Sequence, residues 1–329
     1  MQAIVLVGGE GTRLRPLTNT VPKPALTLVD RPFLAYLVEW LADHGVTEAV
    51  LACGFLPDVL REALGVGEHA GVRLRYVVEP ERRGTAGAIR FAADSLGPAL
   101  EDRFLAINGD VLADLDLTAL LRAHEQRDAR ATLALYSVED SAAYGLVEVG
   151  GDGEVLEFVE KTGERVPGQV NAGAYCLERS VLDLIPADRE VSIEREVFPS
   201  LVGDGLSALR LDGYWMDIGT PERYLRASWD ILEGRVATRV EATAPGLYIG
   251  PGAKIAPDAI VGPRAVVSAR CRVAAGAELQ DSVLLEDCSV GEGARVSGCI
   301  LAPGVNVEAG AVLADTIVGR DERVPAQTR

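Results

Sequence analysis

A glycine-rich segment near the N-terminus carries the residues best suited to phosphate chemistry. It reads GGEGTRLRP at residues 8–16, directly after a short apolar run, and a Pro-Lys-Pro triplet follows at residues 22–24. Glycines let backbone N–H groups approach a phosphate closely, and Arg13 and Lys23 add positive charge. A dinucleotide fingerprint needs a third glycine further along, and a Walker A loop needs Gly-Lys-Ser/Thr, so both are excluded. The segment predicts a phosphate-binding turn.

Two aspartates stand where a metal ion could be held. Asp110 ends an Asn-Gly-Asp triplet directly after the apolar run Phe104–Asn108, and Asp217 lies in the sequence WMDIGTP at residues 215–221. Mg²⁺ takes oxygen ligands and is usually held by one or two carboxylates together with substrate phosphates and water. Each aspartate could instead close a strand-end turn or cap a helix. Taken alone, neither motif decides between the two interpretations.

A Glu-Lys pair, Glu160 and Lys161, follows an apolar run that ends at Val159. A lysine is a compact point charge that suits a phosphate, and a neighbouring carboxylate suits sugar hydroxyls. Such pairs are also common on exposed surfaces. The chain contains only three lysines, however, and two of them, Lys23 and Lys161, fall inside these motifs. This scarcity favours a functional role.

The elements that must position these residues alternate between short apolar runs and amphipathic stretches from Met1 to about Leu232. Most of the runs are apolar throughout, which a parallel sheet covered by helices on both faces requires. The pattern predicts strands at residues 3–7, 48–53, 74–79, 104–108 and 132–137, helices at 32–41, 57–64, 86–96, 117–126 and 222–232, and a hairpin of residues 146–149 and 155–159. The fold class is therefore α/β.

A different period begins after Gly234. Aliphatic residues recur at intervals of six: Ile249, Ile255, Val261, Val267, Val273, Leu279 and Leu285. Mostly small residues stand four positions after each of them, and the intervals are then five or six residues through Val290, Val296, Leu301, Val307, Leu313 and Val318. Neither a helix nor an ordinary strand has this period. It predicts a hexapeptide solenoid, in which each short strand points one aliphatic residue into a narrow prism.

The string at residues 8–16, with its downstream Pro-Lys-Pro, resembles the signature of nucleotide-sugar pyrophosphorylases, also called sugar-1-phosphate nucleotidyltransferases. The other motifs follow that family in order, so the resemblance covers nearly the whole chain. Within the family, the chain is most similar to the mannose-1-phosphate guanylyltransferases. The resemblance implies a Rossmann-like, glycosyltransferase-A-like nucleotidyltransferase domain with a mixed sheet at residues 1–234. It also implies a left-handed parallel β-helix at residues 235–329.

The same resemblance implies a reaction in which an NTP and a sugar 1-phosphate, assisted by Mg²⁺, give an NDP-sugar and pyrophosphate. It makes Asp110 and Asp217 the metal carboxylates and assigns catalytic roles to Arg13, Lys23 and Lys161. The nucleotide-binding residues that it implies are Leu6, Gly8, Gly9, Gly11, Thr12, Arg13, Glu79, Gly84, Thr85, Gly87, Asn108 and Gly109. The residues that it implies for the sugar phosphate are Gly145, Glu160, Lys161 and Asn171.

Glu79 bears on the choice of base. Thymidylyl- and uridylyltransferases of the family typically carry glutamine at this position. Guanine presents two donors, N1–H and the exocyclic amine, and a carboxylate accepts both, whereas thymine and uracil present one donor between two carbonyls. Glu79 therefore favours GTP. Arg82 and Arg83 depart from the usual Pro-Leu of the guanylyl members, and Glu79 could be a solvated carboxylate at a strand end, so a thymidylyl- or uridylyltransferase acting on glucose 1-phosphate stays open.

Composition excludes several other classes. A formal net charge of −17 argues against nucleic-acid and anionic-membrane binding, because both need a broad basic face. No apolar run approaches the ~20 residues that span a bilayer. The five cysteines are odd in number and lack CxxC spacing, which indicates buried thiols in a reducing cytoplasm.

The sequence argues against two other functions. Some relatives use a hexapeptide domain as an acyltransferase with a histidine base, but His44, His69 and His124 all precede the repeats here. A non-catalytic subunit that binds an NDP-sugar also exists in the family, and retention of the charged motif residues argues against it. The resemblance implies a homo-oligomer, a dimer or a tetramer. The flat aliphatic faces and exposed strand ends of the repeats suit such β-helix contacts.

Overall fold

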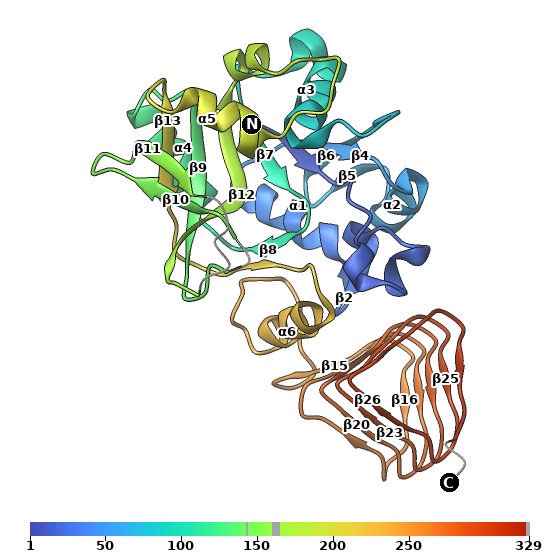
Figure 1. Ribbon diagram of the computed structural model, residues 1–329. Helices are drawn as coiled ribbons and strands as arrows, with labels where there is room; N and C mark the ends of the chain where they lie inside the picture. The colour runs from blue at the N-terminus through green and yellow to red at the C-terminus, as the bar shows by residue number, and fades with distance from the viewer. Residues whose placement is uncertain (143, 160–164, 327–329) are drawn as a thin grey trace. The chain divides into compact units, whose positions relative to one another are not determined.

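The computed structural model describes residues 1–142, 144–159 and 165–326. The chain forms two compact units (Figure 1). The first unit consists of Met1–Gly9 and Leu34–Trp215, and the second unit of Glu10–Phe33 and Met216–Arg329. The charged half of the glycine-rich segment therefore groups with the C-terminal part of the chain. The domain boundary between residues 234 and 235 stays a prediction.

A ten-stranded sheet forms the centre of the first unit. Its strands are β1 (Gln2–Leu6), β4 (Glu48–Cys53), β5 (Gly67–His69), β6 (Val72–Val78), β7 (Arg103–Asn108), β9 (Ala131–Val138), β10 (Leu146–Val149), β11 (Val155–Val159), β12 (Gly168–Glu178) and β13 (Leu206–Arg210). β1 runs parallel to β4 and β7, and β4 runs parallel to β6. β12 pairs antiparallel with β7 and β9, so the sheet is mixed, as predicted. The predicted hairpin is also confirmed, as β10 and β11.

Helices cover this sheet because its central strands are apolar on both faces. The helices are α1 (Phe33–Asp43), α2 (Pro57–Leu64), α3 (Gly84–Leu96), α4 (Leu117–Gln126) and α5 (Phe198–Leu201), with β8 (Val111–Ala113), the 3-10 helices η4 (Gly97–Ala99) and η5 (Arg179–Leu184), and the π-helix η6 (Ile193–Val197). Every residue of β4 is buried, and α3 packs on β1 and β4. The core gathers Ile4, Ile89 and Phe104 from these elements. Asp116 caps α4, since its side chain accepts a hydrogen bond from the N–H of Ala119 at 2.9 Å.

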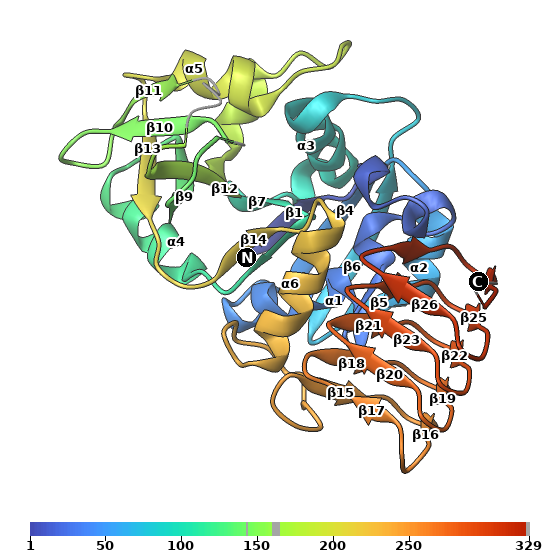
Figure 2. The same cartoon turned by 60° about the horizontal axis from the view of Figure 1, so that its bottom comes forward.

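The second unit contains a parallel β-helix. In the described part of this unit, the short strands are β15 (Leu247–Ile249), β16 (Lys254–Ile255), β17 (Ile260–Val261), β18 (Ala265–Val267), β19 (Arg272–Val273), β20 (Glu278–Gln280), β21 (Ser282–Leu284), β22 (Ser289–Val290), β23 (Arg295–Ser297), β24 (Ile300–Leu301), β25 (Asn306–Val307), β26 (Val312–Ala314), β27 (Ile317–Val318) and β28 (Arg323–Val324). They stack as three parallel sheets, whose coils are seen nearly end-on in Figure 1 and from the side in Figure 2. The repeat architecture predicted from the sequence is confirmed.

The change of interval in the sequence corresponds to a change of coil length. Leu247 pairs with Ala265 in the next coil, and Ala265 pairs with Ser282, so the coil shortens from 18 residues to 17. Predicted interior residues such as Leu279 and Val307 are fully buried. Ile249, Ile255 and Val261 are only half-buried, because the first coil has a neighbour on one side only.

The rest of the second unit consists of short elements and one long helix. They are η1 (Thr12–Leu14), η2 (Leu17–Asn19), η3 (Lys23–Ala25), β2 (Thr27–Leu28), β3 (Arg31–Pro32) and α6 (Pro221–Leu232), while β14 (Trp215–Asp217) joins the two units in sequence. Thr220 caps α6 by accepting from the N–H of Arg223 at 3.4 Å. Within the described ranges, the chain has no helix of the length and hydropathy that crossing a bilayer requires.

Truncation of an interior residue tests the packing of the β-helix. Leu279→Ala should lower the free energy of unfolding by about 2–5 kcal/mol, because it leaves a cavity among buried aliphatic side chains. Ile260→Ala, at a side chain that is 62% exposed, should cost less than ~0.5 kcal/mol. Urea unfolding of both variants measures the difference. Equal costs would contradict the assignment of Leu279 to the interior.

Candidate nucleotide and sugar-phosphate site

The carboxyl ends of four parallel strands lie at one edge of the sheet, and several predicted site residues of the first unit lie at or directly after these ends. Leu6, near the end of β1, pairs with Ala52 of β4 and with Asn108 of β7, and Cys53 of β4 pairs with Val78 of β6. The segments that follow these strands contain the predicted glycines 8 and 9, Glu79 and the Asn-Gly-Asp triplet. In open α/β sheets, ligands bind outside this edge of the strands.

Glycines at this edge allow the backbone segments to approach each other closely. The N–H of Gly109 donates to the carbonyl of Leu6 at 2.9 Å, and a Cβ on Gly109 would lie 2.6 Å from that carbonyl oxygen. A Cβ on Gly8 would lie 3.7 Å from Oε1 of Glu79. The backbone after β1 therefore lies against the Glu79 carboxylate. Asn108 Oδ1 is buried and has no hydrogen-bond partner among the described residues, so it is available to a ligand.

Glu79 is half-buried, and its surroundings determine its chemistry. Burial raises the pKa of its carboxyl group above the ordinary value. The positive charge of Arg83 and a hydrogen bond from the Arg83 backbone lower this pKa, but by less than burial raises it. When ionised, the carboxylate can accept two parallel hydrogen bonds from a planar ligand.

The turn at the start of α3 holds three predicted nucleotide-binding residues, Gly84, Thr85 and Gly87. Gly84 has φ of 69°, and a Cβ on it would lie 2.5 Å from the carbonyl oxygen of Val191. That carbonyl also accepts from the backbone N–H groups of Ala86, at 2.9 Å, and Gly87, at 3.3 Å. These contacts support the turn after Glu79. Whether its residues also contact the nucleotide stays a prediction.

Of the predicted sugar residues, Gly145 directly precedes β10 and Asn171 lies on the neighbouring strand β12. Leu146 of β10 pairs with Val170 of β12, so in an antiparallel register Gly145 and Asn171 stand opposite each other. The amide of Asn171 donates from Nδ2 to the hydroxyl of Tyr175 at 2.8 Å. Glu160 and Lys161 lie outside the described residues, and their roles stay predictions.

Arg13, Lys23 and Asp217 come together within the second unit. Lys23 Nζ lies 3.5 Å from Asp217 Oδ1, and the Lys23 side chain is only 8% exposed. A Cβ on Gly219 would meet both Nη2 of Arg13, at 2.5 Å, and Oδ1 of Asp217, at 3.2 Å. Arg223 Nη1 lies 3.2 Å from the other oxygen, Asp217 Oδ2. Three cations therefore surround one carboxylate, and this excess of positive charge suits a phosphate-bearing ligand.

No motif in the sequence pointed to Arg223. The only signal was its place in the first turn of α6, six residues after Asp217, and many surface helices carry an arginine there. Gly11 and Thr12, which were predicted, lie beside this cluster. Gly11 has φ of 62°, and a Cβ on it would lie 3.1 Å from the Cβ of Lys23. A side chain at this position would thus displace Lys23 as well as strain the backbone.

Comparisons with known proteins identify the family. The "Nucleotidyl transferase" family model matches residues 2–234, and a model described as "GMPPB C-terminal domain" matches residues 243–329. This chain belongs to the nucleotidyl transferase family. It is an enzyme of the nucleotidyltransferase class, as the resemblance had implied.

Relatives of this nucleotidyltransferase are similar over most of its length. A mannose-1-phosphate guanylyltransferase of Mycobacterium tuberculosis is 39% identical over 323 residues, which cover 95% of this chain and 83% of the relative. A probable mannose-1-phosphate guanylyltransferase 1 of Oryza sativa is 37% identical over a segment that covers 90% of this chain and 82% of the rice protein. The crystal structure of HddC from Yersinia pseudotuberculosis is 29% identical, with a TM-score of 0.61, over 70% of this chain and 99% of HddC. HddC has also been solved in complex with GMP-PN.

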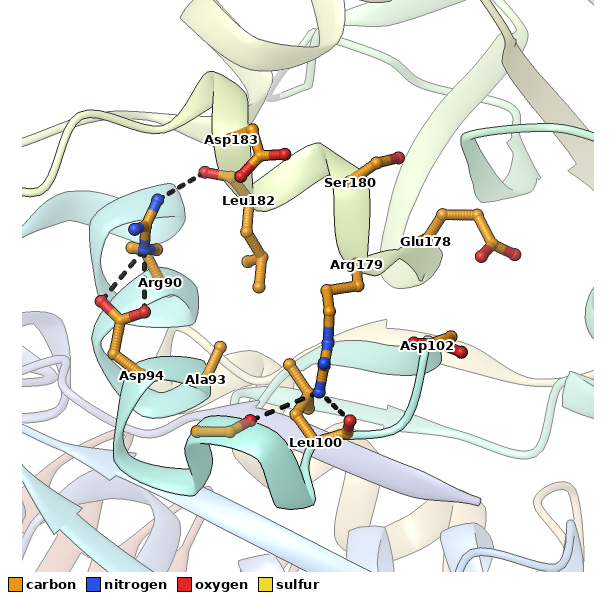
Figure 3. A pocket seen from close by; sticks show the side chains of 11 residues that line it. Arg90, Ala93, Asp94, Leu100, Asp102, Glu178, Arg179, Ser180, Leu182 and Asp183 are labelled. Carbon is orange, nitrogen blue, oxygen red and sulfur yellow. Dashed lines mark hydrogen bonds and ion pairs between the residues drawn. The ribbon is translucent and has the colours of Figure 1, made fainter.

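A pocket of about 540 Å³ elsewhere in the nucleotidyltransferase is separate from this site (Figure 3). It lies near Asp102 and Glu178, where β7 begins and β12 ends, and none of the predicted site residues lines it. Its arginines are already bound: Arg90 to Asp94 and to the Leu182 carbonyl, and Arg179 to the Leu100 carbonyl. The arginines of this pocket are therefore held by a carboxylate and by backbone carbonyls.

A glycine substitution tests the turn at the start of α3. Gly84→Ala should reduce kcat/KM by about 100-fold or more, because the added Cβ meets the Val191 carbonyl and must displace the turn beside Glu79. Gly97→Ala is the matched control: Gly97 also has a positive φ, 53°, but a Cβ there meets no atom within 4 Å. Steady-state kinetics and thermal unfolding of both variants separate crowding from backbone strain. Equal losses would show that strain alone is responsible.

Proposed function

We propose that this nucleotidyltransferase uses GTP and a sugar 1-phosphate of the mannose or glucose type, and forms a GDP-sugar and pyrophosphate. The observation that carries the proposal is the half-buried carboxylate of Glu79 beside the backbone after β1. N1–H and the exocyclic amine of guanine are two adjacent donors that this carboxylate can accept together. The names of the relatives, mannose-1-phosphate guanylyltransferases, and the GMP-PN complex of HddC support the same substrates.

The chemistry needs positioning and charge neutralisation more than an activated nucleophile. The attacking oxygen belongs to a phosphate that is already ionised at neutral pH, so no general base or covalent intermediate is required. The attack on the α-phosphorus brings two anions together in a protein of net charge −17. In this proposal, Arg13, Lys23 and Arg223 neutralise the triphosphate, and Lys161 neutralises the sugar phosphate. Asn171 and Glu160 orient the sugar through its hydroxyls.

The donor set also fits a divalent cation. Asp110, in the turn after β7, and Asp217, on β14, carry hard carboxylate oxygens of the kind that Mg²⁺ prefers. Two protein carboxylates are enough, since Mg²⁺ normally completes its coordination shell with substrate phosphates and water. We propose that Asp110 and Asp217 hold Mg²⁺, which when bound neutralises charge on the reacting phosphates.

The proposal extends to assembly and location. In the sheet β17-β20-β23-β26, Ile260 and Val312 stand in one register line and are 62% and 53% exposed. Exposed aliphatic side chains on a regular sheet face suit contacts between copies of the chain, which supports a homo-oligomer with β-helix contacts. The buried thiols and the acidic composition support a cytoplasmic location.

The assignment of Asp110 and Asp217 to Mg²⁺ predicts a large loss of turnover when either carboxylate is replaced by an amide. Asp110→Asn or Asp217→Asn should reduce kcat about 100-fold or more, because the amide keeps the shape of the side chain and removes its charge. Asp212→Asn, at a side chain that is 89% exposed, should have little effect. Pyrophosphate release is measured over a range of Mg²⁺ concentrations, with circular dichroism as the check on folding. Normal Mg²⁺-dependent turnover by either active-site variant would refute its role as a ligand.

The base-reading role predicts a change in nucleotide preference. Glu79→Gln should lower kcat/KM for GTP, relative to dTTP or UTP, by about 10- to 100-fold, because an amide can accept only one of guanine's two donors. Glu81→Gln is the control, since that side chain is 76% exposed. The assay compares all four triphosphates at saturating sugar 1-phosphate. Unchanged ratios in Glu79→Gln would remove the base-reading role.

The raised pKa of Glu79 adds a pH dependence to the same prediction. As the pH falls through this pKa, the carboxyl group binds a proton and loses an acceptor for guanine, so KM for GTP should rise. The rise should begin at a higher pH than an exposed carboxyl group would produce. A profile of KM for GTP between about pH 4 and 8 measures it. This rise of KM at low pH should be missing in Glu79→Gln. If the rise persists in that variant, another titrating group causes it.

A further inference from the structure

Glu194, in the π-helix η6, accepts hydrogen bonds from three hydroxyl groups. Its Oε2 accepts from Thr85 Oγ1 and from Ser192 Oγ, both at 2.8 Å, and its Oε1 accepts from the hydroxyl of Tyr175 at 3.4 Å. Among the described residues, no ion pair with Glu194 is present. A carboxylate bound in this way can only accept, so it determines where each hydroxyl proton points.

The hydrogen bond from Thr85 has a defined direction. The backbone N–H of Ile193 donates to Thr85 Oγ1 at 2.8 Å. The hydroxyl carries a single proton, and that proton is donated to Glu194. Thr85 belongs to the first turn of α3, directly after Gly84. Glu194 and its neighbour Ile193 thus hold the turn that supports Glu79.

The hydrogen bond from Tyr175 extends the network to the predicted sugar residue. Tyr175 is completely buried, and burial and then the charge of Glu194 raise the pKa of its hydroxyl well above the ordinary value. The hydroxyl therefore keeps its proton, donates it to Glu194 and accepts from Asn171 Nδ2 at 2.8 Å. Asn171 Oδ1 in turn accepts from the N–H of Gly173 at 2.9 Å. The amide cannot flip without losing both bonds, because its N–H and C=O ends would exchange places.

A bulge in β12 makes this geometry possible. Asn171 pairs with Leu135 of β9 and Tyr175 pairs with Leu133, so four residues of β12 advance against two of β9. Gly173 lies inside the bulge with φ of 74°, and a Cβ on it would lie 2.7 Å from Nδ2 of Asn108. The bulge therefore brings the side chains of Asn171 and Tyr175 together and places them beside the Asn-Gly-Asp turn.

We propose that Glu194 is a positioning residue for the reaction. Through Tyr175 it fixes the orientation of the Asn171 amide, and through Thr85 it fixes the position of the turn at the start of α3. The sugar and the base are thereby held in a fixed position relative to each other. The fixed amide leaves one N–H and one oxygen lone pair of Asn171 for sugar hydroxyls. This inference rests on the proposed function, which assigns Asn171 to the sugar phosphate.

The kinetic test separates the two branches of the network. Tyr175→Phe removes only the hydroxyl and should raise KM for the sugar 1-phosphate about 5- to 10-fold, with kcat and KM for GTP changing less than about twofold. Thr85→Val should raise KM for GTP instead. Glu194→Gln should raise both, because one amide oxygen cannot serve three hydroxyls. Ser192→Ala is the matched control: it removes a hydroxyl from the same carboxylate without touching Asn171, so KM for the sugar 1-phosphate should stay within about twofold.

A double variant distinguishes positioning from a general loss of structure. If Tyr175 acts through the amide, Asn171→Ala combined with Tyr175→Phe should have the same KM for the sugar 1-phosphate as Asn171→Ala alone. Additive increases would overturn the proposal. So would an unchanged KM in Tyr175→Phe when the parent enzyme is active.

A second readout does not depend on activity. The chain contains only four asparagines, Asn19, Asn108, Asn171 and Asn306, so ¹⁵N-asparagine labelling gives four side-chain amide pairs in an NMR spectrum. The Asn171 pair is assigned by its absence from Asn171→Asp. Tyr175→Phe and Glu194→Gln should shift this pair, whereas Ser192→Ala should not. Unchanged Asn171 signals would overturn the positioning role, while a parent enzyme that releases no pyrophosphate with any pair of substrates would overturn the proposed function alone.

Discussion

A nucleotidyltransferase of net charge −17 needs positive charge close to its phosphate-bearing substrate. Over distances beyond ~8 Å, solvent ions screen the background of −17, so only nearby cations act on the substrate. In the proposed function, this charge comes from Arg13, Lys23 and Arg223, which lie around Asp217 in the second unit. Lys23 is almost completely buried there, and its pairing with Asp217 keeps its charge compensated until a ligand arrives.

Three carboxylates of this enzyme have different surroundings, and these surroundings determine the chemical role that each can take. Asp217 is surrounded by cations and can share them with a phosphate or accept a metal ion. Glu79 is half-buried and has a raised pKa, so it can read a pair of donors as long as it is ionised. Glu194 is bound by hydroxyl groups, which makes it an orienting group. In the proposed function, the same functional group thus serves charge neutralisation, base recognition and alignment.

At the carboxyl edge of the sheet, close backbone approaches permit only glycine at several positions. Gly84, Gly109 and Gly173 each lie where a Cβ would come within 2.7 Å of another group. These close approaches bring the loops after β1 and β7 and the bulge of β12 against one another. A ligand at this edge therefore meets backbone and short polar side chains on rigid strands, which favours accurate positioning.

The sequence alone determined the features that depend on periodicity and local chemistry. The six-residue interval predicted the β-helix, because each coil must place one aliphatic residue per face in the prism. The later intervals of five correspond to the shorter coils that the structure shows. The apolar run 48–53 predicted β4, the two short runs at 146–149 and 155–159 predicted the hairpin of β10 and β11, and the amphipathic stretch at 57–64 predicted α2. For α3, the sequence placed the start two residues late, since glycines at positions 84 and 87 hide a helical turn that Val191 supports from outside.

Only the tertiary structure decided which distant residues meet. Nothing in the sequence pairs Arg223 with Asp217, joins Glu10–Phe33 to the C-terminal unit, or links Thr85, Tyr175 and Asn171 through Glu194. Periodicity reports which face of an element is buried, whereas these contacts depend on how elements far apart in the chain pack and on a bulge that changes the register of β12. For that reason the kinds of residue in the site were predictable, and the network that aligns them was not.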